Sequence, residues 1–215
     1  MLVKERLSSP VISVEPTMPI MDALKLMQEN GIRRTPVLNK RGKLVGIVSD
    51  KDLLNAAPSD ATTLSVWEIN YLLAKVQVKD VMTREVLTTQ EDAPIEEVAY
   101  TMVKNKIGGM PVMRGDQVVG LITETDLFKI FLELMGAQDE GVRVTALVPE
   151  KVGELDELTH AIAVAGGSFI AFGQFAGESE ANKLVTFKVV GLAQDEVEEK
   201  VKPHVEKIID IRVCC

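Results

Sequence analysis

The first half of the chain carries the same pattern of apolar and polar positions twice. Each copy starts with a short apolar run, continues with a proline followed by apolar residues at helical spacing, and ends with two β-rich runs joined by a polar turn. The pattern predicts a β-α-β-β-α unit in each copy. The first runs lie at 11–14 and 85–89, the β-rich runs at 35–39, 43–49, 110–114 and 117–123, and the second helices start at Asp50 and Glu124.

An internal repeat underlies this pattern. A shift of 75 residues, which becomes 74 after the turn, places these residues on identical ones: Val11, Pro19, Ile20, Met27, Asn30, Ile32, Pro36, Val37, Val45, Gly46, Asp52 and Leu53. The one deletion falls in the turn, where a loop accepts it. Because a unit of about 50 residues buries little surface alone, we expect repeats at 1–60 and 78–136 to pack together, joined by a linking helix at 61–77.

The pattern changes after residue 141. It predicts the order β-α-β-β-α-β, with β-rich runs at 142–148, 168–175, 183–190 and 208–213, and helices at 152–165 and from Ala193 to about Val205. This order is the split arrangement of ferredoxin-like folds, in which the helices cover one face of an antiparallel sheet. We therefore predict an α+β chain with a separate domain at 142–213.

Each repeat ends its hairpin in the same motif: a glycine, two apolar residues, a hydroxyl residue and an aspartate three positions later. It occurs at Gly46, Ser49 and Asp52 and again at Gly120, Thr123 and Asp126. One interpretation is a capping box at a helix start, because a hydroxyl and an acid at this spacing satisfy backbone N–H groups. The other is a nucleoside site, in which the carboxylate accepts hydrogen bonds from ribose hydroxyls and the helix N-terminus favours phosphate. Both can hold together.

The two glycines of the motif stand in the middle of predicted strands, which capping leaves unexplained. Glycine weakens a strand unless something must approach the backbone closely. Gly46 and Gly120 are therefore candidate binding-site residues beside the hydroxyl and acid pairs.

The paired units, the motif ends and the Pro-Val strands at Pro36 and Pro111 resemble the cystathionine β-synthase (CBS) domain, present as a tandem pair over about residues 1–136. The resemblance implies an adenosine-containing ligand, such as AMP, ATP or S-adenosylmethionine, in the cleft between the two copies. It implies ribose contacts for Asp52 and Asp126. It also implies that Ser49 and Thr123 lie near the ribose or phosphate, and that the runs before each proline flank the ligand.

These flanking runs differ between the repeats. The first has Arg33 and Arg34, whereas the second has Gly108 and Gly109 at the same positions. An arginine fork suits phosphate, although two solvated surface arginines are an equally open interpretation. We expect at most one strong nucleotide site, formed by Asp126 with Arg33 or Arg34 nearby.

Residues 142–213 resemble the ACT domain, a regulatory module whose members often sense amino acids near a glycine after the first strand. The resemblance rests on Gly153 after the first predicted strand and on Gly166-Gly167 at the end of the first helix. For Gly153 itself we favour a helix start over a ligand contact. The order of two CBS repeats and an ACT-like domain is similar to that of acetoin utilisation proteins.

Composition narrows the class of protein and its partners. The 215 residues are 46% hydrophobic and 26% charged, as in ordinary globular proteins, and no apolar stretch approaches the roughly 20 residues of a membrane helix. The charged N-terminus does not fit a signal peptide, so we expect a cytoplasmic protein. A net charge of −8 argues against nucleic acid or an anionic membrane as partner. The two cysteines, Cys214 and Cys215, offer no metal-ligand spacing.

Catalysis is disfavoured, because histidine is the usual acid–base group and both His160 and His204 lack a nucleophile or acid at a useful spacing. The sequence predicts a regulatory, ligand-sensing protein that acts on its C-terminal domain or on a separate protein target. The alternative is a scaffolding protein whose motifs serve only as helix caps. A homodimer is expected, since both modules that the chain resembles usually self-associate and two-fold closure is the commonest solution.

Overall fold

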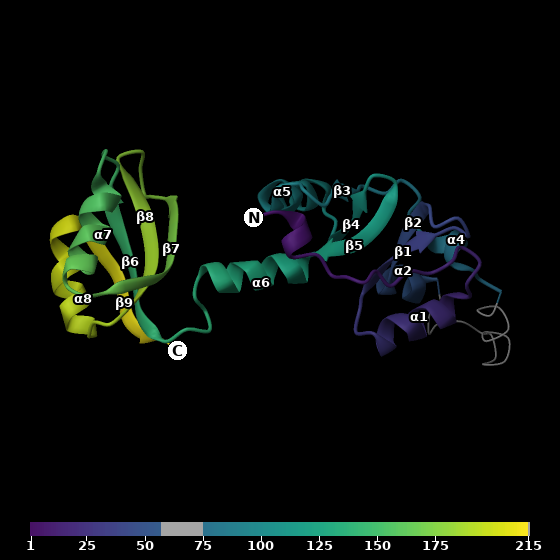
Figure 1. The fold of residues 1–215 in the computed structure, drawn as a ribbon, viewed down its shortest axis with the longest axis horizontal. Coiled ribbons are helices and arrows are strands. Elements are labelled where there is room, and N and C mark those ends of the chain that lie inside the picture. The colour runs from purple at the N-terminus through teal and green to yellow at the C-terminus, as the bar shows by residue number, and fades with distance from the viewer. Residues whose placement is uncertain (57–74, 215) are drawn as a thin grey trace. The chain divides into compact units, whose positions relative to one another are not determined.

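The computed structural model describes residues 1–56 and 75–214, and the chain divides into two compact units, Met1–Leu127 and Phe128–Cys215 (Figure 1). The predicted linking helix at 61–77 falls almost wholly outside the described residues. Within the described residues, no helix combines the length and apolar character needed to span a membrane.

The first repeat forms its predicted elements in order: α1 (Ile20–Glu29), β1 (Arg34–Leu38), β2 (Leu44–Ser49) and α2 (Asp50–Asn55). Helix α1 starts after Pro19, and the predicted apolar stripe faces the core. The hairpin β1–β2 is antiparallel. The run at 11–14 contributes only an isolated parallel bridge from Val14 to Val37, because Pro10 and Pro16 on either side of it have no N–H group to donate.

The second repeat has the same order of helix, hairpin and helix, preceded by a short helix and a first strand: α4 (Val78–Val81), β3 (Thr89–Gln90), α5 (Ile95–Asn105), β4 (Gly109–Arg114), β5 (Gln117–Thr123) and α6 (Glu124–Leu134). Strand β3 pairs with β4 in parallel, and β4 pairs with β5 in antiparallel fashion. The run at 85–89 becomes a strand only at Thr89. The predicted β-α-β-β-α order is therefore confirmed in the second repeat, whereas the first repeat has an isolated bridge in place of the predicted first strand.

Each repeat completes its core with the segment that leads into the other repeat. Helix α4 places Val78 in the core of the first repeat, whereas the 3-10 helix η1 (Val3–Glu5) places Val3 in the core of the second. Val3 and Val78 are both 0% exposed and lie 75 residues apart, the offset of the repeat. Neither repeat has a complete core alone, and this is why the two must pack together.

The exchanged segments also explain the two mid-strand glycines. A Cβ atom on Gly46 would lie 2.5 Å from the sulfur of Met82 and 3.0 Å from the carbonyl oxygen of Thr83. A Cβ on Gly120 would collide with the side chain of Leu7 and lie 2.8 Å from the carbonyl oxygen of Ser8. The close approach that the sequence predicts at both glycines is thus made by the chain's own backbone.

The C-terminal unit has the predicted β-α-β-β-α-β order: β6 (Gly141–Pro149), α7 (Glu154–Val164), β7 (Ser168–Ala176), β8 (Asn182–Val190), α8 (Gln194–Val201), η2 (Lys202–His204) and β9 (Lys207–Cys214). The sheet order is β7-β8-β6-β9, all antiparallel, and Figure 1 shows both helices on one face. Helix α8 ends at Val201 rather than near Val205, because Pro203 has no N–H for a helical bond.

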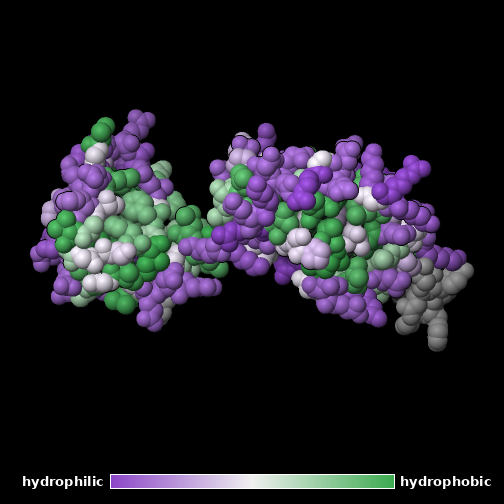
Figure 2. All heavy atoms as spheres, viewed as in Figure 1, coloured by the Kyte–Doolittle hydropathy of each residue, from purple (hydrophilic) through white to green (hydrophobic). Residues whose placement is uncertain are grey.

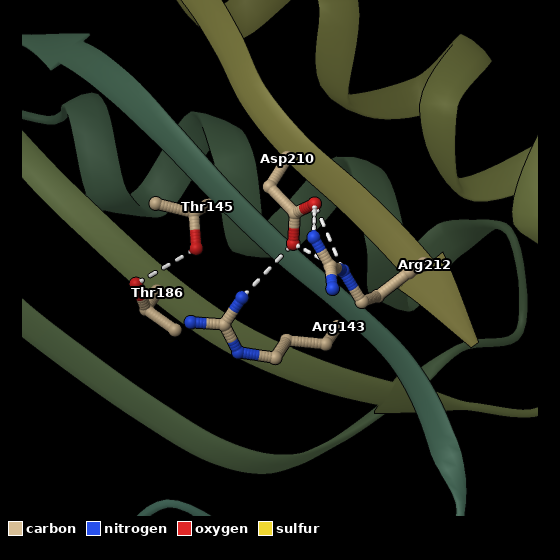
Figure 3. A network of polar contacts seen from close by, with 5 residues as sticks. All are labelled: Arg143, Thr145, Thr186, Asp210 and Arg212. Atoms are coloured by element: carbon tan, nitrogen blue, oxygen red, sulfur yellow. Dashed lines mark hydrogen bonds and ion pairs between the residues drawn. The ribbon is translucent and has the colours of Figure 1, made fainter. Parts of the chain in front are cut away.

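The sheet face opposite these helices carries a polar network (Figure 3). Arg143 Nη1 donates to Asp210 Oδ2 at 3.0 Å, and Arg212 on the same strand as Asp210 also donates to its carboxylate. The hydrogen bonds from Arg212, helped by the charge of Arg143, lower the pKa of the Asp210 carboxyl. Beside them, the hydroxyls of Thr145 and Thr186 lie 3.1 Å apart. This face therefore combines polar contacts with buried side chains such as Leu147.

The glycine contacts give a test of the exchanged segments. Gly120→Ala is expected to lower the free energy of unfolding of the CBS pair by about 1–3 kcal/mol, because the Ser8 carbonyl cannot move away as a side chain can. Gly46→Ala is expected to cost less, since the atom nearest to its new methyl group is the flexible sulfur of Met82. Urea unfolding of both variants measures the difference; no loss in either would contradict the described packing.

Candidate functional site

A pocket of about 410 Å³ opens between the two repeats of the first unit. The first repeat contributes the end of β2, the start of α2 and Arg34, and the second contributes the segments 85–87 and 105–109. The volume falls within the range of small-molecule sites, about 300–1,000 Å³. Apolar side chains line part of its wall: Ile47, Val48, Val86, Leu87 and Ile107.

Ser49 and Asp52 stand at the polar end of this wall and form the predicted capping box. Asp52 Oδ2 accepts hydrogen bonds from Ser49 N at 2.8 Å and from Ser49 Oγ at 2.7 Å, and Asp52 N donates to Ser49 Oγ at 3.2 Å. The structural interpretation of the motif is therefore confirmed here. All three bonds leave Asp52 Oδ1 without a hydrogen-bond partner among the described residues. One oxygen of this carboxylate holds the helix start, and the other is available to a ligand.

The second copy of the motif has the same helix cap, but both carboxylate oxygens of its aspartate accept hydrogen bonds. Asp126 Oδ2 accepts from Thr123 N at 2.9 Å and from Thr123 Oγ1 at 2.7 Å. Its Oδ1 accepts a long hydrogen bond of 3.4 Å from Ser8 Oγ, and the residue is only 7% exposed. Asp126 is not among the residues that line the pocket described above. The two aspartates are equivalent in sequence, but Ser8 donates a hydrogen bond to Oδ1 of Asp126 and no described residue does so to Oδ1 of Asp52.

Arg34 lies in the pocket with Asp52, whereas the sequence analysis paired an arginine with Asp126. The side chain of Arg34 extends over Gly108 of the other repeat, where a Cβ atom would collide with the guanidinium group. The missing side chain of Gly108 is the physical reason for this placement. Arg34 has no ion pair or hydrogen bond among the described residues.

The remaining predicted site residues lie outside the pocket lining. Arg33 is exposed, and its carbonyl oxygen accepts a hydrogen bond from Asp50 N. Pro36 and Pro111 are buried in β1 and β4, where each precedes a core valine. Gly46 and Gly120 are covered by the exchanged segments.

Sequence reasoning missed two charged residues of the pocket wall, Glu85 and Lys106. Both are exposed. Lys106 was detectable, because the repeat alignment places it on Gly31 and a lysine that replaces a turn glycine is unusual. Glu85 carried no signal, since it belongs to a connecting run without periodicity.

A smaller pocket of about 250 Å³ lies in the C-terminal unit, where β6 meets α7. Gly153 has φ 89° and caps α7, in agreement with the favoured structural interpretation. The next residue, Glu154, is 4% exposed, and its Oε2 lies 3.2 Å from Lys151 Nζ. The carboxylates of Glu154 and Glu157 raise the pKa of the Lys151 ammonium. Among the described residues, no group of three or more side chains is arranged to hold a metal ion.

Comparison with known proteins agrees with this geometry. The family model of the CBS domain matches residues 3–59 and 78–133. The chain is 34% identical over 131 residues to L-aspartate semialdehyde sulfurtransferase of Methanocaldococcus jannaschii; the match covers 60% of this chain but only 23% of that enzyme. The chain belongs to the CBS domain family, of which it carries a tandem pair.

Two solved structures match the same part of the chain. The CBS domain pair of protein MJ0100, in complex with 5′-methylthioadenosine and S-adenosylmethionine, is 33% identical with a TM-score of 0.51, and the match covers 61% of this chain and 95% of that one. The protein AcuB of Vibrio cholerae, described as an acetoin utilization protein, is 31% identical with a TM-score of 0.53, and the match covers 65% of this chain and 96% of that one.

Proposed function

We propose that the CBS pair is a regulatory module that binds one adenosine-containing ligand in the pocket beside Asp52. The observation that carries this proposal is that only one of the two carboxylate oxygens of Asp52 takes part in the helix cap among the described residues. Oδ2 is used by the helix cap, and Oδ1 has no partner among the described residues although it belongs to a residue of the pocket wall. A carboxylate oxygen in this position accepts hydrogen bonds from ribose hydroxyls.

The rest of the pocket supports a nucleoside. The apolar wall that includes Val86 and Leu87 suits the flat faces of adenine, and the start of α2 with the hydroxyl of Ser49 suits the polar sugar. The MJ0100 pair, which holds two adenosine compounds, supports the same class of ligand. AMP, ATP and S-adenosylmethionine all remain candidates at this level.

The pocket at Asp52 takes the place of the Asp126 site that the sequence analysis favoured. Ser8 already donates to Asp126 Oδ1 at 3.4 Å, so a ribose hydroxyl would have to displace it. No such contact opposes a ligand at Asp52 within the described residues. We infer one strong site per chain, as the sequence analysis expected, with the first repeat supplying its carboxylate.

We also propose that the C-terminal unit is a regulatory domain of the ACT type and that the ligand acts through it or through a protein target. The β-α-β-β-α-β order, the antiparallel sheet and the glycine cap of α7 support this assignment. A ligand can shift this unit only if it binds one arrangement of the chain more tightly than another. The role is regulatory and not catalytic, and the protein is expected in the cytoplasm.

A homodimer forms part of the proposal. Leu54 and Phe128 occupy the same position in the two repeats and are 55% and 68% exposed. Figure 2 shows that apolar side chains also gather on the face of the CBS pair turned toward the viewer. Exposed apolar groups of this kind favour self-association.

The proposed roles of the two Asp52 oxygens, one in the helix cap and one in ligand binding, can be tested by Asp52→Asn. The asparagine oxygen can still accept from Ser49 N, so we expect the helix cap and the melting temperature to be retained. Loss of the charged acceptor should weaken AMP binding about 10- to 100-fold by titration calorimetry, as for a hydrogen bond to a charged group. Asp126→Asn is the matched control in the second repeat, with affinity expected within about twofold of the parent.

The opposite result, loss of binding in Asp126→Asn alone, would move the site to the second repeat. If neither AMP, ATP nor S-adenosylmethionine gives heat or raises the melting temperature of stripped protein, the motifs serve only as helix caps and the scaffolding alternative holds.

Regulation predicts a response beyond the pocket. Saturation of the full chain with the ligand that binds in the calorimeter should alter amide hydrogen exchange in residues 141–214 as well as around Asp52. Exchange that changes only in the CBS pair would contradict coupling to the C-terminal unit.

Sedimentation equilibrium tests the dimer. We expect a species of twice the 23.5 kDa chain mass at micromolar concentration. Leu54→Asp should shift this equilibrium toward the monomer, and an unmixed monomer for the parent protein would overturn the proposal.

A further inference from the structure

Lys188 is a buried lysine without a carboxylate partner. It lies on β8 between the core residues Phe187 and Val189, so its side chain points to the opposite face of the sheet, and it is 3% exposed. Its Nζ donates to the carbonyl oxygens of Gly136 and Asp139, both at 2.8 Å, and no acidic side chain pairs with it among the described residues. A buried ammonium is costly, and an apolar side chain of similar size often serves stability as well. This lysine therefore points to a use beyond stability.

The two carbonyl groups belong to the connector between α6 and β6, residues 135–140. Gly136 follows the helix in the left-handed region, with φ 56°, which is the usual glycine at a helix end. A Cβ atom on Gly136 would lie 3.2 Å and 3.3 Å from side-chain atoms of Ile170 and Ala171 on β7. The connector is therefore packed against β7 and tied to β8 by Lys188.

The start of α6 is tied to the wall of the candidate ligand pocket. Glu124 is the first residue of the helix, and its N–H donates to the carbonyl oxygen of Gly108 at 3.2 Å. Gly108 belongs to the segment 105–109, which lines the pocket. The helix then runs without a break to Leu134. One continuous helix thus leads from the pocket wall to the connector that Lys188 holds.

We propose that Lys188 is a positioning residue for regulation, through which a displacement of α6 by ligand at the segment 105–109 moves β8. The inference rests on the proposed function and names the residue that links ligand binding to the C-terminal sheet. Coupling of this kind needs rigid elements joined by hydrogen bonds, whereas a connector without the ammonium would absorb the displacement. The positive charge also suits the carboxyl end of a helix, where the carbonyl groups carry partial negative charge.

The test compares the parent with Lys188→Met in the full chain, because methionine removes the ammonium and keeps a long side chain. Without ligand, amide hydrogen exchange in residues 135–140 should become about tenfold faster, since ionic hydrogen bonds that hold the connector are lost. The melting temperature should be retained, because an apolar group replaces a buried charge. Saturation with AMP should alter exchange in β8 of the parent and leave β8 of the variant unchanged.

Two further variants control for charge and for folding. Lys183→Met removes a lysine from the same strand, where it pairs with Glu150 at 3.3 Å, and should keep the parent's response to AMP. Gly136→Ala keeps Lys188 but strains the left-handed turn and crowds Ala171, so it should also weaken the response of β8. It carries the test if Lys188→Met does not fold. Calorimetry should show AMP binding in every variant, because none of the three substituted residues lines the pocket between the repeats.

The outcomes separate this inference from the proposed function. A response of β8 that persists in Lys188→Met, or connector exchange that stays at the parent rate, would overturn the role of Lys188 while the ligand site stands. A parent that binds AMP without any response in β8 would overturn the coupling and this inference with it. Absence of binding by every adenosine compound would overturn the proposed function, and the exchange measured without ligand would then still decide whether Lys188 holds the connector.

Discussion

The exchange of lead-in segments between the two repeats is the constraint on which the first unit depends. Val3 fills the core of the second repeat and Val78 fills the core of the first, both fully buried. Each repeat is therefore incomplete without the other. The exchange also fixes the site, because Ile47 and Thr83 exchange two backbone hydrogen bonds of 2.9 Å, and this pairing holds residues 85–87 opposite Asp52.

A symmetric fold carries an asymmetric pair of sites. The capping box of Ser49 and Asp52 recurs at Thr123 and Asp126 with similar distances. The neighbours differ, because Ser8 donates to Asp126 Oδ1 whereas Asp52 Oδ1 has no partner among the described residues. The two repeats thus have equivalent backbones at the motif, and under the proposed function single residues at the contact between the repeats decide which motif receives the ligand.

The fold followed from the sequence because its signals are local and repeated. Helical stripes after Pro19 and Pro94, hairpins around short polar turns and the β-α-β-β-α-β order all depend on periodicity over a few residues. The loss of the first strand in the first repeat did not follow, since Pro10 and Pro16 beside the run 11–14 lack the N–H donors that an apolar run alone suggests. The end of α8 at Val201 has a similar cause in Pro203.

The site was predictable only in part. The motif residues Ser49 and Asp52 were found from their spacing, and the mid-strand glycines correctly signalled a close approach. What approaches them was not predictable, because segments far apart in sequence make that contact. The position of Arg34 depends on a long side chain crossing to Gly108 of the other repeat, and the conformation of Lys106 depends on how α5 ends. Such features arise from tertiary structure and have no period to detect.

A crystal structure of the chain grown with AMP tests the central claim most directly. The account predicts one nucleotide per chain in the pocket between the repeats, with ribose hydroxyls within about 2.6–3.2 Å of Asp52 Oδ1 and the adenine against Val86 and Leu87. Nucleotide bound at Asp126 instead, or a pocket at Asp52 that stays free of nucleotide at saturating AMP, would contradict it.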